Sequence, residues 1–288
     1  MFDECCMRKF TSKRSVIAIF LSIVMVVMTF VLLNGKGIAH AAPSHPSQAA
    51  QSTKTTIAIV IDDFGNNMKG TDDMLNLPVP ITVAVMPFLQ TSAKDAEKAH
   101  QMGHDVIVHM PMEPKSGKAS WLGPGAVLAN MTDAEIEKRV REAIAAVPHA
   151  VGMNNHMGSK VTADKRIMRV VLKVCKEKGL YFLDSRTNFR SIVGEVGQEV
   201  GVKVLNNHLF FDQQYTLAHI NKQWAKLIEM SNTQPITIAI GHVGVFGPKT
   251  ASVLRSSIPN VTQKVRFVRV SDLVKEQQST YFQEKVAK

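Results

Sequence analysis

The sequence predicts an α/β fold, namely a distorted (β/α) barrel of seven or eight mostly parallel strands in a single domain, residues 57–275. Short apolar, β-branched runs recur along the chain, helical patterns separate many of them, and polar residues follow their C-terminal ends. An open doubly wound sheet is the alternative, but this number of strand–helix units favours a barrel. The expected strands are Ile57–Ile61, Ile81–Met86, Val106–His109, Ala150–Met153, Leu180–Leu183, Val202–Leu205, Ile236–Ile240 and Val265–Val270.

Four helices are expected between these strands. The clearest covers 132–147, where Thr132 and Glu135 form a capping box and apolar residues recur on one face. Another covers 163–178 and is followed by Gly179, which suits a helix C-terminus. The same periodicity predicts helices at 92–102 and 216–230.

The N-terminal 42 residues have a different character from the domain. Four basic residues precede an uncharged apolar run at 16–33, and Ala39-His40-Ala41 is a small-residue cleavage pattern, so we expect a signal peptide. The run is just long enough to span a bilayer, which leaves a membrane tether as the second interpretation. Residues 43–56 are expected to be a flexible linker and 276–288 a C-terminal tail. Both interpretations predict a secreted or extracytoplasmic domain.

The chain of 288 residues carries a formal charge of +10 and is 45% hydrophobic, an ordinary globular composition. A basic exported domain could favour an anionic surface such as a cell wall. Nucleic acid is not an expected partner, because no basic stripe interleaved with aromatic residues is visible. Beyond residue 42, Cys175 is the only cysteine and lies in an apolar helical stripe, so a buried, inert thiol is expected.

Polar residues follow the predicted strands at the point where each strand ends. Asp62 and Asp63 follow the first strand, His109 ends the third, and His156, Asp184 and His242 follow later ones. In a parallel barrel these ends meet on one face, which is where ligands bind. Taken singly, the aspartates could be a helix cap and a turn residue, and each histidine a satisfied polar group.

Together, Asp63, His109 and His156 offer one oxygen and two nitrogens, a set that suits a divalent metal. Zinc with an open coordination position is the first expectation, and Co, Ni or Fe(II) would also fit. Glu113, four residues after His109, is a candidate fourth ligand or a partner of a ligand.

Five motifs resemble the divergent polysaccharide deacetylase family, a distant branch of the NodB-homology carbohydrate esterases. The resemblance extends from about Thr55 to Val274. The motifs are Ile61-Asp62-Asp63-Phe64-Gly65, Gly103-His104-Asp105 leading to His109, Gly152 to Ser159, Phe182 to Thr187, and Ala239-Ile240-Gly241-His242.

The resemblance implies a distorted barrel, a divalent metal and distinct roles for the two aspartates. Asp62 matches the general base and Asp63 a metal ligand. His109 matches the first histidine of the second motif, and Glu113 stands where the family has the second. His156 then supplies the missing nitrogen.

Further roles are implied for the later motifs. His242 matches the late histidine that acts as general acid, and Asp184 falls where an acid orients a catalytic partner. Asn155, Arg186 and Trp121 are candidates for substrate binding, since an aromatic ring can stack on a sugar.

The first functional hypothesis is a metal-dependent hydrolase that removes acetyl groups from an extracellular polysaccharide, such as a cell-wall glycan. A non-catalytic barrel that binds a glycan or an envelope partner is the second. A metal hydrolase acting on a glycosidic or amide bond is the third.

Overall fold

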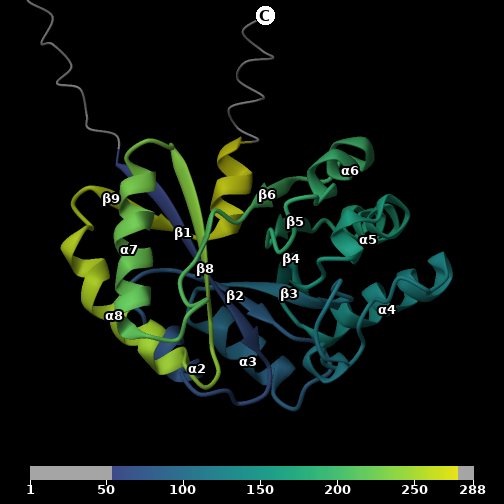
Figure 1. Cartoon of the computed structure of the whole chain (residues 1–288), viewed down its shortest axis with the longest axis horizontal. Coiled ribbons are helices and arrows are strands. Elements are labelled where there is room, and N and C mark those ends of the chain that lie inside the picture. The colour runs from purple at the N-terminus through teal and green to yellow at the C-terminus, as the bar shows by residue number, and fades with distance from the viewer. Residues whose placement is uncertain (1–53, 278–288) are drawn as a thin grey trace, which may run out of the picture. The chain divides into compact units, whose positions relative to one another are not determined.

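The computed structural model describes residues 54–277, which form a strongly curled α/β sheet surrounded by helices (Figure 1). The sheet has nine strands in this part of the chain, and every ladder is parallel. The strand order is β6-β5-β4-β3-β2-β1-β8-β7, and β9 also pairs with β1. Within residues 54–277 no ladder joins β6 to β7, so the barrel is incomplete there.

The strands are β1 (Thr55–Phe64), β2 (Thr82–Val85), β3 (Asp105–Met112), β4 (Ala150–Met157), β5 (Tyr181–Asp184), β6 (Val204–Asn206), β7 (Leu209–Phe210), β8 (Ile236–His242) and β9 (Val265–Val268). The helices are α2 (Thr71–Leu75), α3 (Ser92–Gln101), α4 (Asp133–Ala146), α5 (Lys165–Glu177), α6 (Val193–Val200), α7 (Leu217–Ser231) and α8 (Gly247–Ser257). Short 3₁₀ turns cover Ala119–Trp121, Val161–Ala163 and Ile258–Asn260.

The alternation of side chains along each strand creates two hydrophobic cores. In β1, Ile57, Ile59 and Ile61 pack outward against the helices, whereas Ala58 and Val60 belong to a smaller core inside the curled sheet. The other strands contribute in the same way. A residue at the end of a strand therefore points to the interior only if it has the parity of the inner core.

The predicted fold class is confirmed, and all eight expected strands and four expected helices are present. The capping box of Thr132 and Glu135 opens α4 as expected. The elements α2, α6, α8 and β7 were not predicted. The helix α2 has five residues and β7 only two, so their apolar patterns are brief, whereas α6 and α8 have 8 and 11 residues.

The predicted leader at 1–42, nearly all of the linker at 43–56 and most of the tail at 276–288 lie outside the described residues. Within the described range, β1 already begins at Thr55. Among the helices of residues 54–277, none has the length and apolar character needed to cross a membrane.

Candidate metal centre

A β-bulge at the end of β1 brings two consecutive carboxylates to one place. In a regular strand Asp62 and Asp63 would point to opposite faces. Here the pairing of β1 with β2 shifts register between Ile61 and Phe64, and Asp63 adopts the left-handed conformation with φ 70°. Bulges re-aim side chains next to functional sites. As a result, Asp62 Oδ2 and Asp63 Oδ1 lie 3.6 and 3.2 Å from the same nitrogen, His109 Nε2.

Asp63, His109 and His156 form a tight cluster in the C-terminal halves of β1, β3 and β4, although β3 continues past His109 to Met112. Asp63 Oδ1 is 3.2 Å from His109 Nε2 and 3.1 Å from His156 Nδ1, and the two nitrogens are 3.1 Å apart. These are the three residues expected from the sequence as an oxygen and two nitrogen ligands. The structure therefore brings together the predicted set.

Asn154 fixes the tautomer of His109. Its Nδ2 donates to Asp62 Oδ1 over 2.9 Å, which directs its Oδ1 toward His109 Nδ1 at 2.7 Å. A carboxamide oxygen only accepts hydrogen bonds, so His109 carries its proton on Nδ1. In the neutral ring, the lone pair of Nε2 then faces the cluster.

His156 is fixed in the same way by a backbone group. Its Nε2 lies 3.0 Å from the carbonyl oxygen of Trp121, which can only accept, so Nε2 is the donor. The lone pair of the neutral ring is then on Nδ1, facing Asp63 and His109. Outer hydrogen bonds of this kind set the tautomer and orientation of metal-binding histidines.

Three electron-pair donors thus converge with no proton between them when both rings are neutral. Asp63 Oδ1 is buried and lacks a hydrogen-bond partner of adequate geometry. Bonds of about 2.1 Å at tetrahedral angles would place zinc ligands about 3.4 Å apart, close to the observed separations. The donor set and the orphaned oxygen fit a divalent cation with an open position.

The electrostatic interactions in the cluster stabilise an ionised Asp63 and a protonated His109. Burial opposes ionisation of Asp63, but His109 and His156 outweigh it and hold the pKa of Asp63 well below its usual value. Burial would lower the pKa of His109, yet Asp62 and Asp63 raise it overall. The cluster therefore attracts positive charge, whether a proton or a metal ion.

Asp62 is the second carboxylate of the site and is almost fully buried. Burial raises its pKa above the usual value, and the nearby rings of His109 and His242 limit that rise. Asp62 Oδ1 accepts from Asn154 Nδ2, whereas no hydrogen bond to Oδ2 is found among residues 54–277 and His109 Nε2 lies 3.6 Å from it. Such a carboxylate, beside the cluster, suits a proton acceptor.

His242 lies beside Asp62, because the two residues are register partners in the neighbouring strands β8 and β1. Its Nδ1 donates to Asp212 Oδ1 over 2.7 Å, and its backbone N–H donates to Asp212 Oδ2 over 2.9 Å. Thr250 Oγ1 donates to the same carboxylate. Burial lowers the pKa of His242, but Asp212 more than compensates and raises it to about 10.

Sequence reasoning missed Asp212, although a signal for it exists. Leu209, Phe210 and Phe211 form an apolar run that stops at Asp212, the same pattern that marked the other strand ends. The run was too short to be recognised as a strand. Asp184, the acid predicted to orient a catalytic partner, does not contact His242 in the structure.

Asp184 has the parity of Phe182, which packs in the outer core, so its side chain points away from the barrel interior. Its carboxylate accepts from Ser191 Oγ at 2.6 Å and from the backbone N–H of Arg186 at 2.8 Å. These contacts order the loop after β5. The acid that contacts His242 is Asp212.

Glu113 does not join the cluster. Its Oε2 accepts from the backbone N–H of Ala129 and its Oε1 pairs with Lys160 Nζ, both at 2.6 Å. It lies beyond the end of β3, and its backbone N–H bonds to Val127. His156 occupies the third position of the cluster.

The three candidate substrate-binding residues are placed differently from one another. Asn155 is buried and holds Met157 O and the backbone N–H of Ser185. The guanidinium of Arg186 lies 3.7 Å from Asp184 and borders a cavity of about 270 Å³ near β7. Trp121 is 58% exposed, and it is its backbone carbonyl that reaches the cluster.

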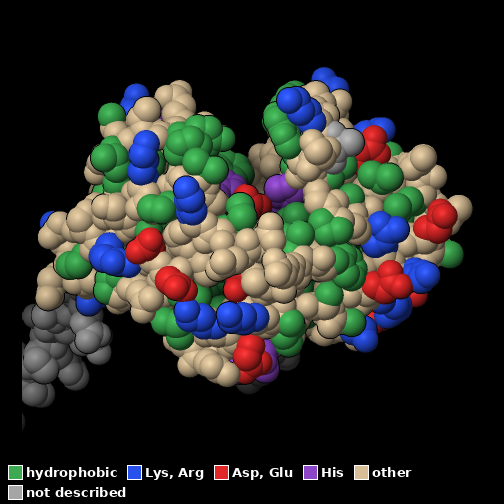
Figure 2. Space-filling view, turned by 90° about the horizontal axis from the view of Figure 1, so that it is seen from below, with side chains coloured by type: hydrophobic (Ala, Val, Ile, Leu, Met, Phe, Trp, Pro, Cys, Tyr) green, Lys and Arg blue, Asp and Glu red, His purple; other side chains and the backbone are tan. Residues whose placement is uncertain are grey.

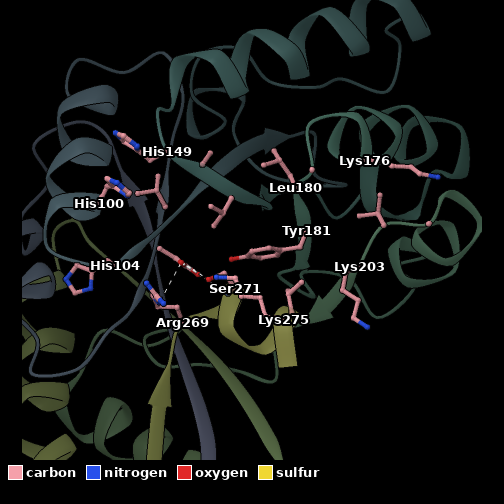
Figure 3. Close-up of a pocket in the computed structure, with 18 residues that line it drawn as sticks. His100, His104, His149, Lys176, Leu180, Tyr181, Lys203, Arg269, Ser271 and Lys275 are labelled. Atoms are coloured by element: carbon pink, nitrogen blue, oxygen red, sulfur yellow. Dashed lines mark hydrogen bonds and ion pairs between the residues drawn. The ribbon is translucent and has the colours of Figure 1, made fainter. Parts of the chain in front are cut away.

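Figure 2 shows a hollow between two raised parts of the surface, with histidine and acidic side chains at its floor. A larger cavity of about 800 Å³ lies at the opposite end of the barrel, where Tyr181, Arg269 and Ser271 approach one another (Figure 3). It contains none of the cluster residues. The chemistry expected at the strand ends therefore does not belong to this larger cavity.

Residues 59–274 match the family model described as divergent polysaccharide deacetylase. The chain belongs to the divergent polysaccharide deacetylase family. One relative is the uncharacterized protein YibQ of Escherichia coli K12, which is 37% identical to this chain over 222 residues. The match covers 77% of this chain and 68% of YibQ. An uncharacterized protein of Haemophilus influenzae is 34% identical over 220 residues, or 76% of this chain and 77% of its own length.

A solved structure supports the fold of this chain. The crystal structure of an uncharacterized protein from Agrobacterium tumefaciens C58 superposes with a TM-score of 0.71 at 20% identity. The match covers 76% of this chain and 89% of that one. The family and its deacetylase-like fold are thus established, together with an Asp/His/His arrangement able to hold a metal ion.

Proposed function

We propose that this divergent deacetylase is a metal-dependent hydrolase that removes acetyl groups from a polysaccharide. The observation that carries the proposal is the convergence of Asp63, His109 and His156 through donor atoms 3.1–3.2 Å apart. Asp62 and, beside it, the His242–Asp212 pair complete the set that acyl transfer to water requires. Zinc is the proposed metal, and Co, Ni or Fe(II) would also suit the ligands.

A divalent metal held by Asp63, His109 and His156 would polarise the acetyl carbonyl and lower the pKa of a bound water to about 7. Asp62 accepts the proton of the attacking water, since its Oδ2 has no hydrogen bond within residues 54–277 and its pKa is raised by burial. His242 is protonated at neutral pH, because its pKa is about 10, and donates to the leaving amine or alkoxide. Asp212 holds the His242 ring in place.

The experiment is acetate release from acetylated oligosaccharides, with mass spectrometry of the products. The expected product has lost one acetyl group, and Asp62→Asn and His242→Ala should abolish the loss while zinc binding remains. Glu113→Gln is the matched carboxylate control and should retain both. A product cleaved at the glycosidic bond, or no product from a zinc-loaded protein, would overturn the assignment.

We also propose that the domain works outside the cytoplasm, exported by the leader at 1–42. Its basic start, apolar run and Ala39-His40-Ala41 pattern support this. The mass of the protein recovered from the envelope is the test. Cleavage after Ala41 indicates a signal peptide, an intact N-terminus indicates a tether through 16–33, and recovery of all the protein from the cytoplasm contradicts export.

A further inference from the structure

Exposed apolar side chains are concentrated in the loops around the face of the domain that carries Asp63, His109 and His156, which we call the metal face. Eight large hydrophobic side chains of residues 54–277 are strongly exposed, and six of them lie in segments that follow strand ends or begin the next helix. Surface patches of this kind mark interaction sites. The six are Phe88, Trp121, Phe189, Tyr215, Leu217 and Val245.

A cation lies over an aromatic ring in three of these segments. Lys118 Nζ is 5.7 Å from the centre of the Trp121 ring, and the Arg190 guanidinium is 5.4 Å from Phe189. Lys249 Nζ is 5.5 Å from the Phe246 ring, which in turn stacks on Tyr215 at 3.9 Å. The three pairs come from the segments after β3, β5 and β8.

The cations of these pairs have no carboxylate partner among the described residues. Lys249 donates to the backbone carbonyl of Tyr215, and neither Lys118 nor Arg190 makes a side-chain ion pair in that range. On the outer helices, several basic side chains do pair with acids, as Arg141 does with Glu137 and Arg169 with Glu199.

The acids in the loops after the strands already have partners among the described residues, and none of them pairs with Lys118, Arg190 or Lys249. Glu113 pairs with Lys160, Asp164 caps α5, and Asp212 is buried against His242. Hydrophobic and basic side chains accordingly gather on both raised sides of the hollow (Figure 2). A ligand on this face would meet apolar rings and uncompensated cations together.

We infer that the metal face binds an anionic polysaccharide, an inference that rests on the proposed function and names its substrate class. The apolar faces of sugar rings pack on Trp121, Phe189 and the Tyr215–Phe246 stack. Carboxylate or phosphate groups of the polymer accept hydrogen bonds from Lys118, Arg190 and Lys249. A polymer suits the spread of the pairs over three separate loops.

The geometry favours a glycan over a membrane that holds the protein by its N-terminal segment. The described chain enters the domain at Lys54, and β1 runs from Thr55 to the bulge at Asp62 and Asp63. A strand rises about 3.3 Å per residue, so the metal face is more than about 20 Å from that entry point. The metal face and Lys54 therefore lie near opposite ends of β1.

The test compares binding of the full chain to polygalacturonate, an anionic glycan, and to dextran, a neutral one. Binding to polygalacturonate should be at least about tenfold tighter and weaken between about 50 and 200 mM salt, as expected for a polyanion. The triple variant Lys118→Gln/Arg190→Gln/Lys249→Gln should lose at least about tenfold in affinity with a shallower salt dependence.

A matched control removes the same charge from the helix surfaces, as Lys138→Gln/Lys173→Gln/Lys222→Gln, and should bind like the wild-type chain. Equal loss in both triple variants would show that general basicity is responsible and would overturn the inference. Tighter binding to vesicles with anionic lipid than to polygalacturonate would also overturn it.

Zinc binding and acetate release measured on the same samples separate this inference from the proposed function. If the chain binds polygalacturonate through the three cations but releases no acetate from any substrate, the hydrolase proposal fails and the inference stands. If neutral and anionic acetylated glycans are hydrolysed equally, and the triple variant acts like the wild type, the inference fails alone.

Discussion

Asp212 holds His242 through both of its oxygens, one on the ring Nδ1–H at 2.7 Å and one on the backbone N–H at 2.9 Å. The double contact fixes the ring relative to its own main chain and leaves Nε2 as the nitrogen available to a ligand. It also explains why the pKa of His242 is raised to about 10 although burial alone would lower it. The proposed general acid therefore depends on a residue that lies two positions after the short strand β7.

Asp212→Asn should lower the pKa of His242, because the amide carries no charge to stabilise the imidazolium. A histidine with a raised pKa in the folded state stabilises fully below its unfolded pKa of about 6.5 and loses that contribution as pH rises through the folded value. The wild-type free energy of unfolding should thus fall between about pH 6.5 and 10 relative to that of the variant.

Two measurements with EDTA present check this prediction. NMR titration of the His242 ring gives the pKa directly, and urea unfolding at several pH values gives the stability difference. Asp184→Asn is the matched control, since Asp184 bonds its own loop, and should leave the His242 titration unchanged. An equal pKa in wild type and Asp212→Asn would contradict the assignment.

Asn154→Ala should weaken zinc binding by about 10- to 100-fold, the usual effect of removing a partner that orients a metal ligand. The variant frees the His109 ring to rotate and leaves Asp62 Oδ1 without its donor. Zinc affinity measured by competition with a chelator checks it. Asn155→Ala is the control, because Asn155 is equally buried but bonds backbone groups of the neighbouring loops, so it should lose stability while retaining zinc affinity.

The sequence predicted the fold and most of the site because both depend on short-range patterns. Apolar runs marked the strands, and the residue at the end of each run marked the face where ligands bind. Asp63, His109 and His156 were found in this way. His242 followed from the same rule.

Side-chain direction was less accessible, because it depends on exact strand ends and on backbone irregularity. Asp184 points outward because it alternates in step with Phe182 along β5. All four residues of β5 are buried, so the sequence pattern does not distinguish the inner from the outer face. The bulge that turns Asp63 toward the cluster is set by the pairing of β1 with β2. Glu113 depends on the path of a long loop, which no periodicity predicts.

Cys175 should resist thiol reagents in the folded protein. Burial raises the pKa of its thiol to about 12, so almost no thiolate exists at neutral pH, and the sulfur packs against Met153 Sδ at 3.9 Å. In a Cys5→Ser/Cys6→Ser background, Ellman's reagent should label no thiol until denaturant is added. Rapid labelling under native conditions would show that α5 opens locally or that the thiol is exposed.

Zinc should raise the thermal midpoint of the wild-type chain, because the metal binds the assembled cluster and the unfolded chain lacks that arrangement. At about 100 times the dissociation constant, the stabilisation is about 2.7 kcal/mol. For a domain of this size that corresponds to about 5–10 °C.

Asp63→Asn should abolish the zinc-dependent shift, while EDTA should return the wild type to its metal-free midpoint. Asparagine tolerates the left-handed conformation of residue 63, so the variant removes the charge and keeps the bulge. Glu113→Gln should retain the full shift, since Glu113 is engaged with Ala129 and Lys160 away from the cluster. A lost shift in Glu113→Gln together with an unchanged one in Asp63→Asn would move the metal site from the end of β1 to the loop after β3.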